Sequence, residues 1–294
     1  MRKGYSLAAA ALLWVVLLGH GQCRLAFVAD IGGNWELCVT DDEGSNTLRL
    51  TDTGLDEKEP CWSPDRQSIV YATSDGRLNR IDVTTKETSV IVDEGLGTPG
   101  ACPCFSPDGG AVAFARYRPP SQGDDTDIKI WDLNTDRTRN GIEQPGIQLW
   151  PAWSPDGTRI AYAATLCSGS CGRILQELWI ADAGMRWARQ LLLTHSFCQQ
   201  PAWSPDGRSI AFSSDMGGGL DLWTVDLDTF CLTRITTHEG LDVKPAWSPD
   251  GRRIAFVSTR SGIMEIWIKD LDTGALHPLR PFGRKTAACR DVAW

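Results

Sequence analysis

One phrase occurs five times along the chain, and it limits the possible folds more than any other feature. Each copy has a proline at its second position, a tryptophan or phenylalanine two residues later, then Ser-Pro-Asp and a short apolar run. The copies begin 43 to 50 residues apart and occupy residues 59–74, 102–117, 150–165, 200–215 and 244–259. A period of this length suits four short strands and their turns, which make one blade of a β-propeller.

The residues of the phrase predict a strand, a tight turn and a second strand. Ser-Pro-Asp-Gly is typical of a type I turn, because proline presets the backbone at the second position and glycine is favoured at the fourth. In the fourth copy, Ser209–Ser213 alternates as a half-buried strand does, and Asp221–Val225 supplies a third strand. A polar hairpin at Asp226–Thr229 then leads to a fourth strand at Thr233–Thr236. The sequence therefore predicts an all-β protein built from four-stranded antiparallel blades.

The two ends of the chain carry the two parts of one further blade. Residues 292–294 match the Pro-Ala-Trp strand of the phrase, and Arg24–Asp30 matches its second strand. Residues 36–40 and 47–51 then supply a third and a fourth strand. Joining these segments closes the propeller and leaves no exposed sheet edge. We therefore expect one domain, residues 22–294, folded as a six-bladed β-propeller whose last blade is closed by the N- and C-terminal strands.

The first 21 residues have the pattern of a secretory signal peptide. Arg2 and Lys3 precede a thirteen-residue apolar run at 6–18, and small residues follow as far as Gly21. A membrane span needs about 20 residues, so an uncleaved anchor is the less favoured interpretation. We expect cleavage after Gly21 and a periplasmic or extracellular protein without stable membrane insertion. A lipid anchor on Cys23 is less favoured, because no small residue precedes it.

The charge of the chain argues against a nucleic-acid partner. The formal net charge is −8, and removal of the signal segment makes it more negative because that segment carries Arg2 and Lys3. Binding to nucleic-acid phosphates requires a basic surface. We therefore expect no nucleic-acid partner, and we expect a monomer.

The repeated phrase, followed in the fifth copy by 265–268 (Glu-Ile-Trp-Ile), resembles the WD-like repeats of the TolB family. The resemblance covers about residues 24–294 and implies a six-bladed propeller that docks partner proteins in the cell envelope. The namesake of the family carries an α/β domain before its propeller, whereas here the first blade follows the signal segment directly. Similar repeats also occur in oligogalacturonide lyases and in peptidases with an added hydrolase domain.

Two functional hypotheses follow from these observations. The first is an exported, non-catalytic scaffold that binds a protein, peptide or glycan partner in the cell envelope. The alternative is a glycan-acting lyase or hydrolase with its site at the propeller mouth. The G-x-S-x-G, P-loop and H-E-x-x-H patterns do not occur in the chain, and we predict no catalytic residue.

One segment has the spacing of a calcium-binding loop but departs from it at a critical position. Acidic or amide residues stand at positions 1, 3, 5 and 12 of the spacing, whereas Arg137 occupies the position at which the loop requires glycine. The segment also matches the ordinary hairpin between third and fourth strands. We therefore interpret it as a hairpin; its spaced residues are Asp132, Asn134, Asp136 and Glu143.

The three histidines beyond the signal segment do not suggest a metal site. His277 falls in a predicted outer strand, whereas His195 and His238 fall in equivalent loops of neighbouring blades. A metal-dependent lyase needs a cluster of ligands. We expect no metal ion and no cofactor.

Export would permit disulfide bonds among the ten cysteines. Cys167 and Cys171 fall in an enlarged loop, and Cys198 lies in the neighbouring entry loop, so we predict at least one bridge among these three. Cys61 and Cys104 occupy the alanine position of Pro-Ala-Trp and are interpreted as small buried residues. Because facing sheets lie about 10 Å apart, we expect these two to be too distant to pair.

Antiparallel alternation places the loops between strands four and one, and between strands two and three, on the same face. These loops vary, whereas the opposite face repeats Ser-Pro-Asp-Gly, and variable loops on a repeated scaffold are free to bind partners. The loop entering the first blade is acidic (Asp52, Asp56, Glu57 and Glu59), and the loop entering the shared blade is basic (Arg280, Arg284, Lys285 and Arg290). As partner-binding residues we predict Trp150, His195, Phe197, His238, Arg284 and Lys285.

Two tryptophans three residues apart are expected to have different roles. Trp153 is the tryptophan of the phrase and should wedge between blades. Trp150 occupies a position that the other copies fill with polar residues or cysteine, so packing does not require an aromatic residue there. An aromatic side chain at the propeller mouth is suited to anchor a partner. The alternative is that Trp150 packs on its own loop beside Leu149.

Overall fold

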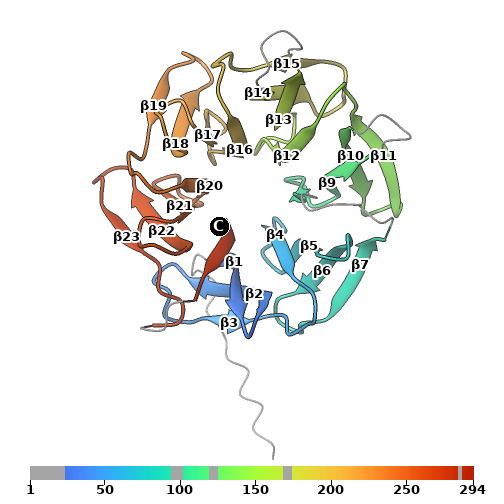
Figure 1. The fold of residues 1–294 in the computed structure, drawn as a ribbon. Helices are drawn as coiled ribbons and strands as arrows, with labels where there is room; N and C mark the ends of the chain where they lie inside the picture. Colours follow the sequence, from blue (N-terminus) through green and yellow to red (C-terminus); the bar gives the residue numbers. More distant parts are fainter. Residues whose placement is uncertain (1–23, 94–101, 119–124, 168–173, 284–286) are drawn as a thin grey trace, which may run out of the picture.

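Six four-stranded antiparallel sheets are arranged radially about one axis in the computed structural model (Figure 1). The structure describes residues 24–93, 102–118, 125–167, 174–283 and 287–294. The first strand of each repeated unit lies innermost and the fourth lies outermost. The predicted six-bladed propeller is therefore confirmed. Within the described ranges, no helix is long and apolar enough to cross a membrane.

Blades 1 to 3 follow the chain from the acidic entry loop onward. Blade 1 contains β4 (Glu57–Trp62), β5 (Ser68–Thr73), β6 (Leu78–Asp82) and β7 (Thr88–Val92). Blade 2 contains β8 (Cys104–Phe105), β9 (Ala111–Tyr117), β10 (Thr126–Asp132) and β11 (Arg137–Ile142). Blade 3 contains β12 (Gln148–Trp153), β13 (Arg159–Cys167), β14 (Ile174–Asp182) and β15 (Ala188–Gln190).

Blades 4 and 5 repeat this order, and blade 6 combines both ends of the chain. Blade 4 contains β16 (Cys198–Trp203), β17 (Ser209–Ser214), β18 (Asp221–Asp226) and β19 (Leu232–Arg234). Blade 5 contains β20 (Asp242–Trp247), β21 (Arg253–Ser258), β22 (Glu265–Asp270) and β23 (Leu276–Pro278). Blade 6 contains β24 (Cys289–Ala293), β1 (Arg24–Ile31), β2 (Asn34–Asp41) and β3 (Leu48–Arg49).

The pairing of β24 with β1 closes the propeller as predicted. Ala293 lies opposite Ala26 and Val292 lies opposite Phe27, and the strand order of the sheet is β24-β1-β2-β3. β1 and β24, which lie far apart in the sequence, are therefore joined by backbone hydrogen bonds. This pairing covers the sheet edge of β1.

One set of hydrogen bonds holds the Ser-Pro-Asp-Gly turns. In blade 3 the Ser154 hydroxyl donates to Asp156 Oδ1 (2.5 Å) and accepts the N–H of Arg159 (2.9 Å). Gly157 N–H donates to the Ser154 carbonyl at 2.9 Å, and Gly157 has a φ of +69°, which favours glycine. The Ser154 hydroxyl, together with backbone N–H donation, favours the charged carboxylate and lowers the pKa of Asp156 to about 2.

The hydrophobic core consists of clusters between neighbouring blades. Trp203 of blade 4 packs with Leu178 of blade 3, and Trp62 of blade 1 packs with Leu37 of blade 6. Trp153 packs against the corresponding cluster between blades 2 and 3. The prediction that the repeat tryptophan wedges between blades is confirmed.

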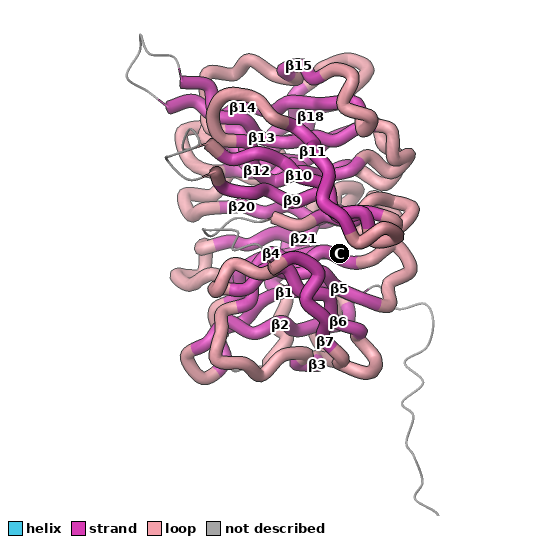
Figure 2. The backbone as a smooth tube through the Cα atoms, turned by 90° about the vertical axis from the view of Figure 1, so that its right-hand side faces the viewer, coloured by secondary structure: helices cyan, strands magenta, loops and turns pink. Residues whose placement is uncertain are grey.

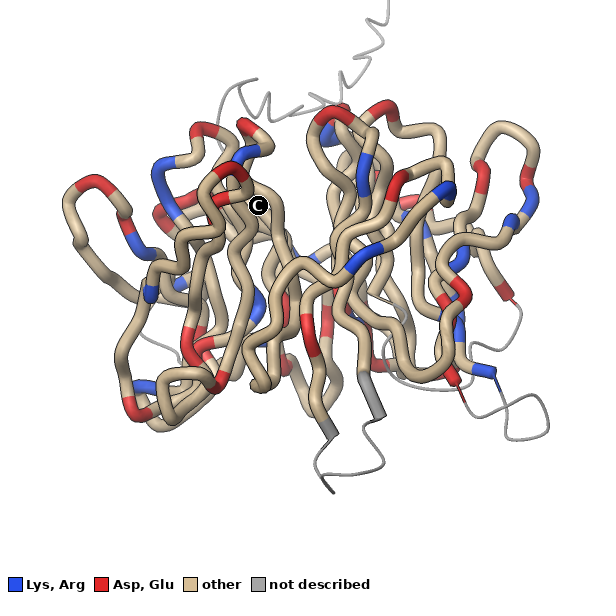
Figure 3. Tube along the Cα trace, turned by 90° about the horizontal axis from the view of Figure 1, so that it is seen from above, with Lys and Arg blue, Asp and Glu red and all other residues tan. Residues whose placement is uncertain are grey.

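Loops and turns gather at the two ends of the strands and form the two faces of the propeller (Figure 2). Lys and Arg lie among Asp and Glu on both faces, so neither sign of charge dominates one face (Figure 3). The loops between strands four and one share a face with those between strands two and three, and we call it the variable face. The opposite face, with the Ser-Pro-Asp-Gly turns, is called the turn face.

Candidate partner-binding site

Six residues at equivalent positions of the six inner segments share one backbone conformation, and we call them the axial ring. Their φ angles of 44° to 57° lie in the left-handed region although none is glycine: they are Glu59, Cys102, Trp150, Gln200, Lys244 and Asp291. In blade 3 the strand register shifts at this point, between Leu149 and Ala152. A β-bulge of this kind redirects a side chain. The repeat thus fixes the backbone of the axial ring and leaves its side chains free to differ.

Hydrogen bonds join neighbouring members of the axial ring. Asp291 Oδ2 accepts the N–H of Glu59 at 3.1 Å, and Glu59 Oε2 accepts the N–H of Cys102 at 2.8 Å. The sulfur of Cys102 accepts the N–H of Trp150. An indole carries no acceptor, so the series ends at Trp150. Trp150 is therefore held by its backbone while its side chain contributes nothing to the series.

Cations of the chain itself balance the acidic members of the axial ring. Lys244 Nζ forms an ion pair with the Asp291 carboxylate and lies 3.8 Å from Glu59 Oε1. Arg290 Nε lies 3.7 Å from Asp291 Oδ2. Gln200 fixes the backbone of the same lysine, because its Oε1 accepts the Lys244 N–H at 3.0 Å. These contacts join blades 1, 4, 5 and 6 around the axis.

The acidic and basic loops of the variable face contact each other. The Arg290 guanidinium lies over Trp35, with its Cζ 4.2 Å from the ring centroid, and donates to the Glu57 carbonyl at 3.2 Å. The N–H of Trp35 in turn donates to Asp56 Oδ1 at 3.1 Å. Burial disfavours the charged guanidinium and lowers the pKa of Arg290. Arg290 is thus engaged within the chain and does not present a free charge.

The structure places Trp150 in the axial ring, half-buried, with its indole N–H enclosed and without an acceptor among the described residues. Trp153, three residues later, packs against Ile160 and Tyr162 in an interblade cluster, whereas Trp150 belongs to no such cluster of the described part. The two tryptophans therefore occupy different environments, as the repeat pattern indicates.

Two of the predicted partner-binding residues lie in the loop that enters blade 4. His195 is exposed and its N–H donates to Glu177 Oε1 at 2.7 Å. Phe197 is half-buried and its N–H donates to Asp215 Oδ1 at 2.8 Å. His238, in the next entry loop, is exposed and its Nδ1 accepts the N–H of Gly240 at 2.8 Å. Arg284 and Lys285 lie outside the described residues.

The predicted disulfide candidates are only partly described. Cys167 ends β13, opposite Ile174, and Cys171 lies outside the described residues. Cys198 is a buried free thiol whose sulfur lies 3.2 Å from Thr194 Oγ1 and 3.4 Å from Ser214 Oγ. Burial raises the pKa of the Cys198 thiol to about 11. A bridge among the three candidates remains a prediction.

Buried carboxylates that sequence reasoning missed hold the loops of the variable face. Glu177 accepts the N–H of Thr194 at 2.9 Å as well as that of His195, and so fixes the loop entering blade 4. Arg234 pairs with Asp221 at 2.5 Å at the equivalent place in blade 4. The signal was present, because an acidic residue directly precedes the apolar third strand at Glu36, Asp127, Glu177, Asp221 and Glu265.

Glu57 and Glu36 form a neighbouring pair of buried acids at the blade 1–blade 6 junction. Thr53 Oγ1 donates to Glu57 Oε1 at 2.8 Å, and Thr51 Oγ1 donates to Glu36 Oε2 at 2.7 Å. Arg49 neutralises Glu36 at 2.9 Å. Burial, with a further contribution from the Glu36 charge, raises the pKa of Glu57 to about 7.

The expectation that Cys61 and Cys104 are too far apart to meet is wrong. The N–H of Phe105 donates to Cys61 Sγ at 3.4 Å, and the two thiols share a hydrogen bond. The 10 Å spacing applies to sheets that face each other squarely. Radial blades converge toward the axis, so their innermost strands approach much more closely than their middle strands.

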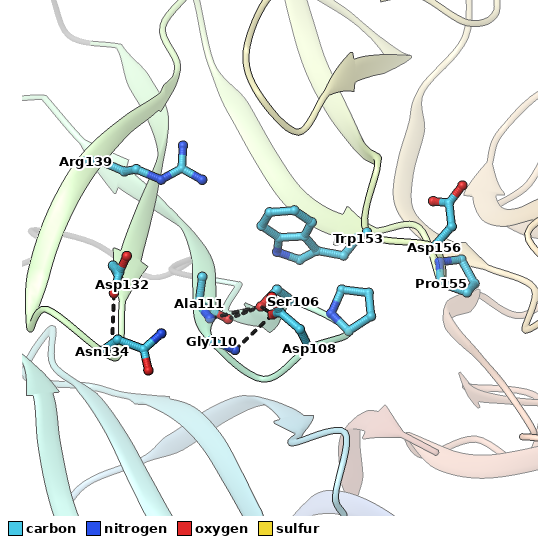
Figure 4. A pocket seen from close by; sticks show the side chains of 12 residues that line it. Ser106, Asp108, Gly110, Ala111, Asp132, Asn134, Arg139, Trp153, Pro155 and Asp156 are labelled. Atoms are coloured by element: carbon cyan, nitrogen blue, oxygen red, sulfur yellow. Dashed lines mark hydrogen bonds between the residues drawn. The ribbon is translucent and has the colours of Figure 1, made fainter.

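A cavity of about 530 Å³ lies on the turn face, between blades 2 and 3, and sequence reasoning did not predict it (Figure 4). Its lining includes Trp153, Arg139 and three carboxylates, those of Asp108, Asp132 and Asp156. The Trp153 ring stands between the turns of the two blades in Figure 4. The cavity therefore exposes an aromatic surface beside negative charge.

The calcium-like spacing falls in the wall of this cavity and is a hairpin, as interpreted. Asp132 Oδ1 accepts the N–H groups of Asn134 and Thr135, each at 2.9 Å. Glu143 lies at the other end of β11 and forms an ion pair with Lys129. The acidic residues thus serve the hairpin and a neighbouring strand.

The chain matches the family described as TolB beta propeller domain over residues 18–170 and 175–290. It is 26% identical over 165 residues to the Tol-Pal system protein TolB of Nitratidesulfovibrio vulgaris, covering 53% of this chain and 36% of that protein. It is 39% identical over 130 residues to the Tol-Pal system protein TolB of Francisella tularensis subsp. mediasiatica, covering 40% and 28%. The chain thus matches about a third of the length of these curated relatives.

Solved structures share the fold. TolB from Acinetobacter baumannii superposes with a TM-score of 0.79 at 22% identity, covering 92% of this chain and 66% of that chain. A putative TolB from Agrobacterium tumefaciens gives 0.70 at 21% identity, covering 92% and 98%. An oligogalacturonate lyase in complex with manganese gives 0.62 at 15% identity, covering 88% and 74%. Because the family match spans most of the sequence, this chain belongs to the TolB beta propeller domain family.

Proposed function

We propose that the chain is an exported, non-catalytic propeller that binds a protein partner in the cell envelope through its variable face. The observation that carries this proposal is the axial ring, in which six positions share one backbone conformation but hold six different side chains. The Trp150 side chain takes no part in the hydrogen bonds that join the ring, so this position can be used for recognition. Trp150 is the aromatic member, and binding energy concentrates in such residues.

The relatives supply the class of partner. Two are named as proteins of the Tol-Pal system, and this chain shares their propeller family. The pattern of residues 1–21 supports export, which would bring the chain to the envelope. A monomer with a rigid closed ring meets the needs of a docking scaffold.

In this proposal Trp150 is the central anchor of the interface. His195 and Phe197 extend the contact over the loop entering blade 4, and His238 extends it over the next loop. Buried Glu177 and half-buried Asp215 accept backbone N–H groups of the first of these loops, so little ordering is needed on binding. Arg284 and Lys285 add positive charge to the segment that precedes β24 in the sequence.

The test compares two tryptophan variants in a crosslinking pull-down from the native envelope. Trp150→Ala should leave the melting temperature nearly unchanged, because Trp150 belongs to no interblade cluster, and should strongly reduce capture of the partner. Trp153 is half-buried against an interblade cluster, so Trp153→Ala should clearly lower the free energy of unfolding, by less than the about 3–5 kcal/mol of fully buried aromatic residues. Partner capture per folded molecule should survive in the Trp153 variant.

Three outcomes would contradict the proposal. The first is wild-type capture by Trp150→Ala, and the second is a melting temperature for Trp150→Ala as low as that of Trp153→Ala. The third is release of sugar fragments when the purified wild-type protein is incubated with envelope glycans, which would favour a lyase or hydrolase. Capture of one envelope protein by wild type, lost in Trp150→Ala, would support it.

A further inference from the structure

The inner segments of blades 1 and 2 each carry a cysteine at the same position of the repeat. In the other four blades this position holds alanine: Ala152, Ala202, Ala246 and Ala293. Cys61 lies on β4 and Cys104 lies on β8, and both are half-buried free thiols. Blades 1 and 2 are therefore the two neighbouring blades that both carry cysteine at this repeat position.

Backbone contacts hold the two sulfur atoms against each other across this junction. The N–H of Phe105, the residue after Cys104, donates to Cys61 Sγ at 3.4 Å. Each thiol also lies near the carbonyl of the residue that follows it, at 3.6 Å for Cys61 and Trp62 and at 3.7 Å for Cys104 and Phe105. The side chains of Cys61 and Cys104 are themselves hydrogen-bonded.

The contacts also distinguish the chemistry of the two thiols. The hydrogen bond between the two thiols, and after it the Trp153 N–H, lowers the pKa of Cys104, which favours its thiolate. The same hydrogen bond raises the pKa of Cys61, together with burial. By contrast, burial raises the pKa of Cys38 and of Cys289 to about 12. Cys104 is the natural attacking sulfur of the pair.

The junction that the pair spans has the weakest inner strand of the propeller. β8 has two residues, which pair with Ala113 and Val112 of β9. The aromatic residue of this blade is Phe105, which is smaller than the tryptophan of the other blades, and its cluster contains only Val70 and Val112 as further fully packed members. A covalent link here would hold β8 to β4 where packing contributes least.

We propose that Cys61 and Cys104 form a reversible disulfide that joins the inner strands of blades 1 and 2. The oxidant is a small-molecule disulfide or the disulfide of an oxidoreductase. The Cys104 thiolate attacks one sulfur of that disulfide and releases the first thiolate, leaving a mixed disulfide on Cys104. Cys61 then loses its proton and attacks Cys104 Sγ, forming the protein disulfide and releasing the second thiolate. The protein dithiol is oxidised by two electrons, and the oxidant becomes two thiols.

The inference is independent of the proposed partner binding. It requires only an oxidising environment, which the predicted export would provide and which a redox buffer supplies in vitro. The result of the Trp150→Ala capture experiment, whatever it is, does not bear on the proposed Cys61–Cys104 disulfide.

The test uses the purified full chain, equilibrated with reduced or oxidised glutathione, followed by thiol alkylation and peptide mapping without reductant. We expect the oxidised sample to contain a peptide crosslinked through Cys61 and Cys104, and the reduced sample to have both alkylated. Closing this loop should raise the melting temperature of the oxidised wild type by about 5 °C over the reduced protein.

The variant Cys61→Ala/Cys104→Ala installs the residue of the other four blades, so it should fold, and its melting temperature should not respond to glutathione. Cys198→Ala is the matched control and should keep the wild-type response. Alkylation of both Cys61 and Cys104 after oxidation would overturn the proposal, as would a bridge from either to Cys102. If the double variant does not fold, the peptide map of the wild type alone decides.

Discussion

Arg159 lies over the ring of Trp203 in the next blade, with its Cζ 4.8 Å from the ring centroid. Arg253 lies over Trp294 at the same distance. The equivalent residue of blade 2 is Ala111, so this position supplies no guanidinium to Trp153, and Arg139 of β11 is the arginine that lines the cavity beside it. The cavity between blades 2 and 3 is therefore the space that an arginine fills elsewhere in the same protein.

Ala111→Arg should stabilise the protein. The new guanidinium would lie on Trp153 and beside the carboxylates of Asp108 and Asp156, and a cation over an aromatic ring contributes about 0.5–1 kcal/mol at an exposed site. The free energy of unfolding from urea titration is the measurement. Ala111→Leu adds bulk without charge and is the control. If the leucine variant is as stable as the arginine variant, the gain in stability comes from filling the cavity and not from the cation.

The free energy of unfolding should fall as the pH rises from about 4.5 to about 7, and Glu57 is the cause. Burial raises the pKa of Glu57 from 4.5 to about 7, so in this window the folded protein holds a proton that the unfolded chain has released. Glu57→Gln should remove this loss and gain about 1–3 kcal/mol at pH 8 relative to wild type, with little gain at pH 4. Urea titrations at several pH values measure it.

Glu87→Gln is the matched control for Glu57→Gln. Glu87 is exposed, so Glu87→Gln removes the same charge without changing the buried pair Glu36 and Glu57. Equal pH dependence in the two variants would mean that net charge, and not the environment of Glu57, sets the slope.

Closure by β24 should be essential for stability. Deletion of residues 291–294 removes the partners of Ala26 and Phe27 in β1 and the acceptor of the Glu59 N–H. We expect a much lower melting temperature and a broader transition. Val292→Pro is the control for a sequence change within β24. It introduces the proline that the other five blades have at this position, so its melting temperature should be close to that of the wild type. Wild-type melting of the deletion variant would refute closure as the stabilising element.

Lys244 and Asp291 should show a measurable coupling. Asp291 is almost fully buried, so loss of the lysine leaves its charge poorly compensated. A double-mutant cycle with Lys244→Ala and Asp291→Asn should give a coupling energy of about 1–2 kcal/mol. A coupling near zero would mean that Arg290 alone compensates Asp291.

Much of the fold could be predicted because one repeat encodes it. The spacing of Pro60, Pro103, Pro151, Pro201 and Pro245 fixes the size of a blade, and the match of 292–294 to Pro-Ala-Trp reveals the closure. Each of these inferences needs only residues that are close in the sequence or equivalent in the repeat. The different environments of Trp150 and Trp153 were visible for the same reason.

What the sequence did not reveal depends on contacts between equivalent positions of different blades. The meeting of Cys61 with Cys104 follows from convergence toward the axis, which a repeat pattern does not describe. The cavity beside Trp153 is lined by residues of two blades, among them Ala111 of blade 2 and Asp156 of blade 3, which are far apart in the sequence. The positive φ of the axial ring was hidden because its residues are not glycine.

The position of β24 in blade 6 has a consequence for the order of events during synthesis. β1 pairs with a strand that is made about 260 residues later, so at a usual rate of translation the edge of β1 waits for tens of seconds. A contact between residues so far apart in the sequence is unfavourable early in folding. The entropy of closing a long loop is lost before the strand pairing can offset it. The ring can therefore close only after β24 has been made, and until then the edge of β1 has no partner strand.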